Sequence, residues 1–134
     1  MRALPLALGI TLLGWLPFVA WSQAVFLNEF HYDNTGTDAD EGVEIAGPAG
    51  TNLESYTVVL YNGTGGAVYN MVLLSGTIPN QGGTGFGAVW IPISGIQNDV
   101  DGMALARNSG SVVVQSLAYE GSLLRQAGRR MESF

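Results

Sequence analysis

The segment Tyr56-Thr-Val-Val-Leu-Tyr61 and the residues that follow it, Asn62-Gly-Thr-Gly-Gly66, decide the fold class. The first six residues are continuously apolar, aromatic or β-branched, which is typical of a strand buried on both faces. Asn62-Gly63 is a strong signal for a tight turn between two strands. Because residues 67–74 resume the strand pattern, the segment 56–74 predicts a β-hairpin.

Similar short runs recur outward from this hairpin, separated by clusters of Gly, Asn, Pro and Ser. No stretch shows a helical period with caps over about ten or more residues. About seven short strands in a chain of this size predict an all-β sandwich. We expect these strands over residues 25–32, 42–46, 56–61, 67–74, 85–91, 102–106 and 112–119.

Three of the runs carry local detail. Pro92 is expected to end the strand 85–91 or to confine it to a sheet edge, because proline cannot donate to the ladder. The connection 75–84 is long enough to cross between two sheets. The strand 25–32 alternates, which predicts one face with Val25, Leu27 and Glu29 and another with Phe26, Asn28 and Phe30.

Residues 1–24 predict a secretory signal peptide. Arg2 supplies the positive start, residues 4–19 are almost wholly apolar, and Ser22-Gln-Ala24 offers the small residues that signal peptidase requires. An uncleaved anchor is the alternative, because residues 4–21 approach the length that spans a bilayer. Two prolines and the cleavage tripeptide favour cleavage after Ala24. We therefore expect a secreted protein, extracellular or periplasmic, with no membrane association after cleavage.

Composition excludes several classes of function. The chain has 134 residues with 11 acidic and 5 basic ones, a formal net charge of -6, and all five basic residues are Arg. A protein that neutralises phosphates needs a basic face, so we expect no direct binding of nucleic acid by this chain. The chain has no Cys, which excludes disulfides, thiolate metal sites and a cysteine nucleophile.

The segment VFLNEFHYDNTGTDADEGVEI, residues 25–45, resembles the start of lamin-tail domains of the bacterial secreted type. Those domains open with a strand carrying an Asn-Glu pair, followed by a loop and a second strand with acidic and β-branched residues. Later segments, including Val59–Gly63, Leu74–Gln81 and Asp101–Leu105, continue the likeness as far as Gly121. The residues that match in the first segment are Asn28, Glu29, Glu41, Val43, Glu44 and Ile45.

The resemblance implies an immunoglobulin-like β-sandwich over residues 25–121 and export from the cell. It also implies an accessory role, because lamin-tail modules accompany secreted nucleases or phosphatases of the endonuclease/exonuclease/phosphatase kind, whose catalytic domain is separate. Gly42 stands where the family has a large aromatic residue, which predicts that one side chain is missing from the core.

Residues 122–134 depart from the family. Arg125, Arg129 and Arg130 make this segment basic, and the β pattern stops there. One interpretation is a short, irregular, basic tail. The other is that the chain is a truncated or frameshifted remnant of a longer secreted protein.

The loop 33–41 is the sharpest chemical signal. It holds four carboxylates and an Asn around a Gly that permits a tight bend. Ca²⁺ takes six to eight oxygen ligands, so Asp33, Asn34, Asp38 and Asp40 are candidate ligands of a calcium ion. The spacing is not that of an EF-hand, and the same residue types are common in turns. A cation site and a solvated turn both remain open.

Side chains suited to acid–base chemistry have simpler structural interpretations. Glu41 and Glu44, from neighbouring segments, could pair as acid and base, but bonds to loop backbone and an outward-facing position are the preferred interpretation. His31 is the only His, and no recognisable nucleophile motif accompanies it. The glycine-rich residues 82–87 lack the Lys of a phosphate loop. We expect no catalytic residues and no required cofactor.

The aromatic side chains have two interpretations. Core filling is the default, whereas a surface strip would bind sugars or partners. The residues concerned are Phe26, Phe30, Tyr32, Tyr56, Tyr61, Tyr69, Phe86, Trp90 and Tyr119.

The sequence thus predicts a secreted, non-catalytic, lamin-tail-like module that acts in protein, extracellular-matrix or surface interaction, with an unidentified partner. Two alternatives remain. The chain could be a fragment of a secreted nuclease or phosphatase without its catalytic domain, or a calcium-dependent adhesion module that uses the acidic loop.

Overall fold

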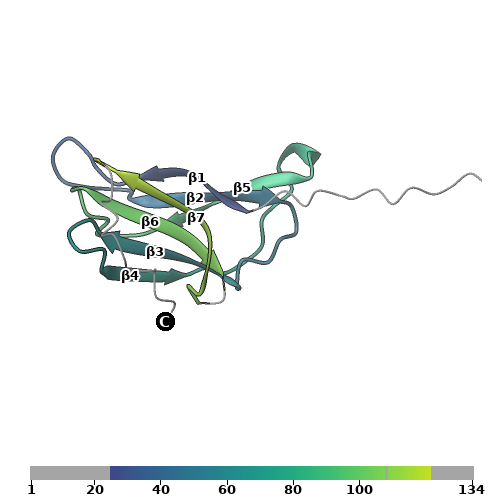
Figure 1. Ribbon diagram of the computed structural model, residues 1–134. Helices are drawn as coiled ribbons and strands as arrows, with labels where there is room; N and C mark the ends of the chain where they lie inside the picture. The colour runs from purple at the N-terminus through teal and green to yellow at the C-terminus, as the bar shows by residue number, and fades with distance from the viewer. Residues whose placement is uncertain (1–24, 108, 122–134) are drawn as a thin grey trace, which may run out of the picture.

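The computed structural model describes residues 25–107 and 109–121 (Figure 1). The expected signal peptide, residues 1–24, and the basic segment, residues 122–134, lie outside the described residues. Each of the seven expected strands is present. They are β1 (Phe26–His31), β2 (Gly42–Pro48), β3 (Tyr56–Asn62), β4 (Val68–Leu73), β5 (Phe86–Pro92), β6 (Asp101–Arg107) and β7 (Val112–Tyr119), with a single 3₁₀ turn η1 (Gln81–Gly83) before β5.

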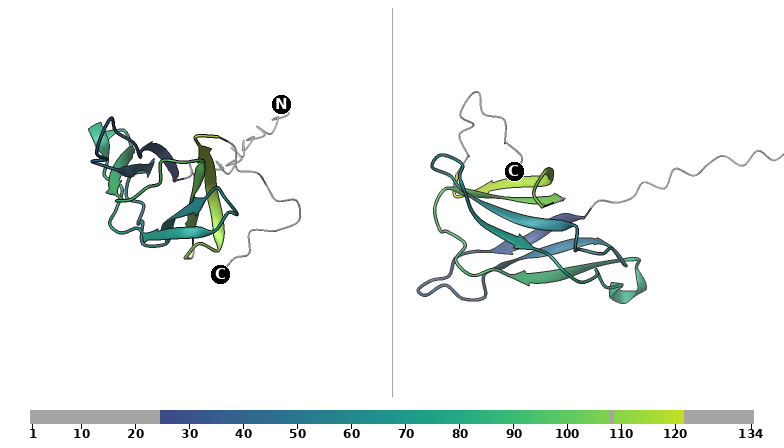
Figure 2. Two further views of the ribbon diagram at one scale, coloured as in Figure 1. Left: turned by 90° about the vertical axis from the view of Figure 1, so that its left-hand side faces the viewer. Right: turned by 90° about the horizontal axis from the view of Figure 1, so that it is seen from below.

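The strands form two antiparallel sheets that pack face to face as a β-sandwich (Figures 1 and 2). One sheet has the order β1-β2-β5 and the other the order β4-β3-β6-β7. The all-β fold class is therefore confirmed. The predicted hairpin 56–74 is β3-β4, the connection after β4 crosses to the other sheet, and Pro92 ends β5, which is an edge strand.

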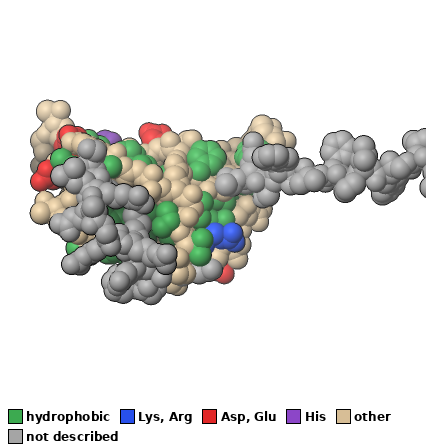
Figure 3. All heavy atoms as spheres, in the orientation of Figure 1, with side chains coloured by type: hydrophobic (Ala, Val, Ile, Leu, Met, Phe, Trp, Pro, Cys, Tyr) green, Lys and Arg blue, Asp and Glu red, His purple; other side chains and the backbone are tan. Residues whose placement is uncertain are grey.

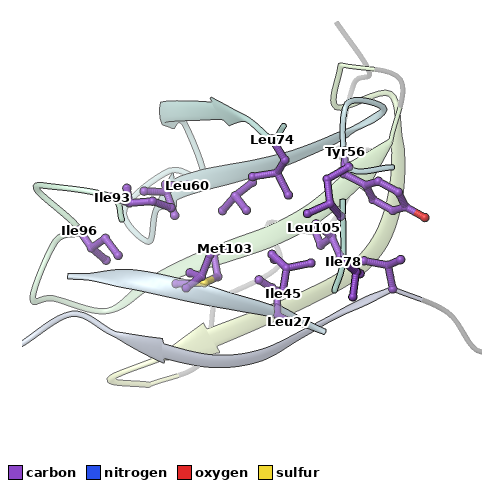
Figure 4. Packing of buried hydrophobic residues seen from close by; sticks show 14 of the residues in the cluster. Leu27, Ile45, Tyr56, Leu60, Leu74, Ile78, Ile93, Ile96, Met103 and Leu105 are labelled. Atoms are coloured by element: carbon purple, nitrogen blue, oxygen red, sulfur yellow. The ribbon is translucent and has the colours of Figure 1, made fainter. Parts of the chain in front are cut away.

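The core lies between the sheets, where alternate side chains of both point inward (Figure 4). The first five residues of β3 are all buried, so the predicted strand buried on both faces is confirmed. Val58 and Leu60 belong to the core, whereas Thr57 and Val59 lie on the outer face. Full burial of one such aliphatic side chain stabilises the fold by roughly 1.5–3 kcal/mol.

A β-bulge in β1 corrects the predicted alternation of this strand. Leu27 pairs with Ile45 and Glu29 pairs with Glu44, so Asn28 is an inserted residue with no pairing partner on β2. An inserted residue reverses the faces of the residues beyond it. Phe30 therefore packs against the core, and Glu29, which the alternation placed with Val25 and Leu27, is exposed.

Gly42 also corrects a prediction, because it leaves no gap in the core. The first residue of β2 faces outward, and a Cβ atom built on it would lie 2.4 Å from the Ile91 carbonyl oxygen and 2.6 Å from the indole ring of Trp90. The neighbouring core positions are filled by Val43 and Ile45, which are fully buried. The glycine makes room for a ring on the outer face of the sheet rather than removing one from the interior.

One side-chain amide ties the two sheets together at an edge. The Leu27 backbone N–H donates to Gln115 Oε1 at 2.8 Å, and Gln115 Nε2 donates to the Leu27 carbonyl at 3.4 Å. Gln115 lies on β7 and Leu27 on β1, so this contact joins strands of different sheets. The Gln115 amide takes the place of a neighbouring peptide group on the free edge of β1.

Candidate functional site

The loops at one end of the sandwich gather most of the described acidic side chains. This acidic end consists of the β1–β2 loop, the β3–β4 turn, the β5–β6 loop and the residues after β7 (left in Figure 1; red in Figure 3). Arg107, the sole Lys or Arg in 25–107 and 109–121, lies at the opposite end of β6, with its guanidinium 5.1 Å from the Tyr56 ring centroid. The acidic residues concerned are Asp33, Asp38, Asp40, Glu41, Asp99, Asp101 and Glu120.

Two of the candidate calcium ligands meet at an amide of the β5–β6 loop. Asn98 Nδ2 donates to Asp38 Oδ2 at 2.9 Å and to Asp33 Oδ1 at 3.4 Å. Asn34 Oδ1 accepts the backbone N–H of Ala39 at 2.8 Å, so Asn34 closes the loop on itself. A cation placed between Asp33 and Asp38 would compete with the Asn98 amide.

Asp40, the fourth candidate ligand, does not join this arrangement; it is exposed and has a left-handed backbone conformation, with φ of 56°. In the part of the chain that the structure describes, no group of three His, Cys, Asp or Glu side chains has the geometry of a metal site.

The carboxylates considered for acid–base chemistry do not converge. Glu41 Oε2 accepts the Gly95 backbone N–H at 2.7 Å, which anchors the β5–β6 loop. Glu44 lies on the outer face of its sheet, where its Oε1 accepts from Asn28 Nδ2 at 2.5 Å. His31 Nε2 lies 3.2 Å from Asn34 Oδ1, so the imidazole of this His contacts a side-chain amide and not a carboxylate.

A hollow of about 380 Å³ opens between the β3–β4 turn and the β5–β6 loop. Asp101 lies in its wall and is only 2% exposed. Asp101 Oδ1 accepts the Gly63 backbone N–H at 2.7 Å, whereas Oδ2 has no hydrogen-bond partner among the described residues. Sequence reasoning missed this position, since a single Asp before an apolar run is common at strand ends. The residues lining the hollow are Asn62, Gly63, Thr64, Gln97, Asp99, Val100 and Asp101.

Three aromatic rings pack together at the acidic end. The centroids of Tyr32 and Tyr119 are 4.8 Å apart, and Phe30 lies 5.5 and 5.4 Å from them respectively. The Tyr32 hydroxyl donates to a Glu120 carboxylate oxygen, and this hydrogen bond is the main reason that the Tyr32 pKa is raised. Burial is the main cause that raises the pKa of Tyr119. These rings fill the core at the acidic end, as expected by default.

Three other aromatic side chains lie on the solvent side of the β1-β2-β5 sheet. Phe26, Phe86 and Trp90 are 39%, 38% and 41% exposed, and we call them the aromatic face. Phe86 and Trp90 are four residues apart on β5, so their Cα atoms are separated by about 13 Å. Core filling is therefore the wrong expectation for these three residues.

Small and polar residues separate the rings of the aromatic face. Ala46 pairs with Phe26 on one side and with Ala88 on the other, so only small side chains lie beside Phe26 on β2 and β5 in this row. Glu44 pairs with Trp90 and lies between that strand and Asn28. The face thus combines exposed rings with hydrogen-bonding groups.

No protein-family model, curated protein or solved structure matches this chain. The lamin-tail resemblance therefore remains a prediction. None of the helices in the described residues is long and apolar enough to span a membrane.

Proposed function

We propose that the chain is a secreted, non-catalytic binding module of the lamin-tail kind, and that it attaches to a neutral surface polysaccharide through the aromatic face. The observation that supports this is the exposure of Phe26, Phe86 and Trp90 on the outer face of the β1-β2-β5 sheet. Scattered single apolar residues are ordinary on protein surfaces, whereas grouped ones indicate interaction sites.

A polysaccharide fits the chemistry of this face better than other polymers. Aromatic rings offer large apolar area with little conformational freedom to lose, and sugar rings present C–H groups that pack on such faces. Glu44 and Asn28 can exchange hydrogen bonds with hydroxyl groups. The carboxylates of Glu29 and Glu44 repel an anionic polymer, so a neutral chain is the favoured ligand.

Trp90 provides a direct test. It is the only Trp in residues 25–134, a segment that contains the seven strands and the hydrophobic core of the described residues. Titration of this polypeptide with soluble neutral polysaccharides, such as β-glucans and chitin oligosaccharides, should change the intensity or wavelength of Trp90 emission. Phe86→Ala should weaken binding about tenfold, because removing a stacked aromatic costs roughly 1–2 kcal/mol.

Met71→Ala is the matched control, since Met71 is exposed on the outer face of the other sheet. It should leave the affinity unchanged. Binding that Phe86→Ala and Trp90→Ala do not weaken in calorimetry, or no binding to any polymer of the panel, would contradict the proposed site. Phosphodiesterase turnover by the purified polypeptide would contradict a non-catalytic module.

A further inference from the structure

The hollow beside Asp101 holds a negative charge that the described protein does not neutralise. Asp101 is 2% exposed and its Oδ2 atom has no hydrogen-bond partner among residues 25–107 and 109–121. A buried carboxylate is costly unless a hydrogen bond, a cation or a proton compensates it. Asp99 adds a second carboxylate to the same wall, and no Lys, Arg or His lines the hollow.

We propose that this hollow binds a calcium ion, with the carboxylates of Asp99 and Asp101 as its charged ligands. The site is distinct from the acidic loop 33–41 and does not depend on polysaccharide binding by the aromatic face. The hollow lies between the β3–β4 turn, which belongs to the four-stranded sheet, and the β5–β6 loop, which crosses between the two sheets, so the ion would join these two loops.

The other oxygen atoms in the wall suit the same ion. Ca²⁺ takes six to eight oxygen ligands from carboxylates, amide carbonyls, hydroxyls and water, in a flexible geometry. Asn62, Gln97 and Thr64 also line the hollow. Asn62 Oδ1 accepts the Thr64 backbone N–H at 2.8 Å and Gln97 Oε1 accepts from Asn62 Nδ2 at 3.4 Å, so each amide oxygen keeps one lone pair for an ion. A volume of about 380 Å³ also leaves room for water molecules to complete the coordination shell.

The wall is held in place before any ion binds. The Gln97 backbone N–H donates to the Tyr69 hydroxyl at 3.2 Å, and Asn62 Nδ2 donates to Gln97 Oε1 at 3.4 Å. A Cβ atom on Gly63 would lie 1.5 Å from the Val100 carbonyl oxygen, so the turn and the loop approach each other as closely as only glycine allows. Such preorganisation lowers the entropic cost of binding.

Calcium titration of the purified protein tests the site. We expect one Ca²⁺ per chain in calorimetry and a rise in melting temperature at millimolar Ca²⁺. Asp99→Asn should weaken binding at least tenfold; Asp99 is exposed, so this variant leaves the core intact. Asp101→Asn should abolish binding, while its amide oxygen can still accept the Gly63 N–H.

Two control variants locate the ion. Asp33→Asn with Asp38→Asn changes the acidic loop, and Glu54→Gln changes a carboxylate before β3 at the opposite end of the sandwich; both should bind Ca²⁺ within twofold of the unmodified protein. Terbium luminescence excited through tyrosine should appear with these controls, and Asp99→Asn should need at least tenfold more terbium to give the same signal. No heat and no melting shift at millimolar Ca²⁺ would overturn the proposal, as would binding lost with the loop variant but kept with Asp99→Asn. If Asp101→Asn does not fold, Asp99→Asn alone decides.

Discussion

Replacing Gln115 with Ala should loosen β1 from the sandwich. The substitution removes the acceptor of the Leu27 N–H, at 2.8 Å, and the weaker donor to the Leu27 carbonyl, at 3.4 Å. A buried donor left without a partner costs about 1–3 kcal/mol. Both bonds are only partly buried, so water can reach the freed groups, and we expect a loss of about 1.5 kcal/mol in the free energy of unfolding. In a domain of this size that loss lowers the melting temperature by roughly 6–12 °C.

The measurement is guanidinium unfolding followed by Trp90 fluorescence, with hydrogen exchange at the Leu27 amide. Ser116→Ala, one residue further along on the exposed outer face, is the control and should change stability by less than about 0.5 kcal/mol. Gln115→Glu should be destabilised at pH 7, because a carboxylate oxygen replaces the donor that faces the Leu27 carbonyl. If Gln115→Ala matches Ser116→Ala in stability and Leu27 exchange stays slow, the reasoning about this contact is refuted.

Two further predictions concern the core. Leu60→Ala, at a fully buried position, should lower the free energy of unfolding by about 2–5 kcal/mol, whereas Leu73→Ala, at a position 71% exposed, should lower it by less than about 1 kcal/mol. Equal losses of stability for the two variants in urea unfolding would contradict the sandwich packing. The Tyr119 pKa is raised above 10.0 in the folded protein, so the folded chain keeps a phenolic proton that the unfolded chain releases. The contribution of Tyr119 to the free energy of unfolding should therefore be constant below pH 10 and fall as the pH rises above 10. Tyr119→Phe should show a smaller loss of stability with rising pH. Identical slopes of stability against pH for the two proteins between pH 9 and 11 would contradict this prediction.

The strands could be predicted because each carries its own signal. The apolar run of β3 and the Asn62-Gly63 turn need no information from elsewhere in the chain. The bulge at Asn28 gives no such signal, since it exists only in the pairing of β1 with β2. The same holds for Gln115, which contacts a residue 88 positions away. Local sequence predicts where the strands run, whereas the register and the edge contacts depend on tertiary structure.

The candidate sites show the same division. The loop 33–41 stood out because its carboxylates are close in sequence, yet Asp33 and Asp38 share one amide from Asn98. Asp101 gave no signal because its burial depends on the flanking strands, where it pairs with Asn62 and Tyr119. The exposure of Trp90 was equally hidden, because alternation along β5 does not reveal which face is covered.

The β5–β6 loop joins the strand that carries Trp90 directly to the strand that carries Asp101. Its anchors limit any coupling between the two proposed sites. The first part of the loop is fixed by Glu41, which bonds Gly95, and its middle by Asn98, which bonds the β1–β2 loop. An ion held by Asp99 and Asp101 would order the last part of the loop, beyond both anchors. Such an ion would stabilise the acidic end without moving Trp90, so adhesion that requires calcium would need a contact at the acidic end itself rather than at the aromatic face.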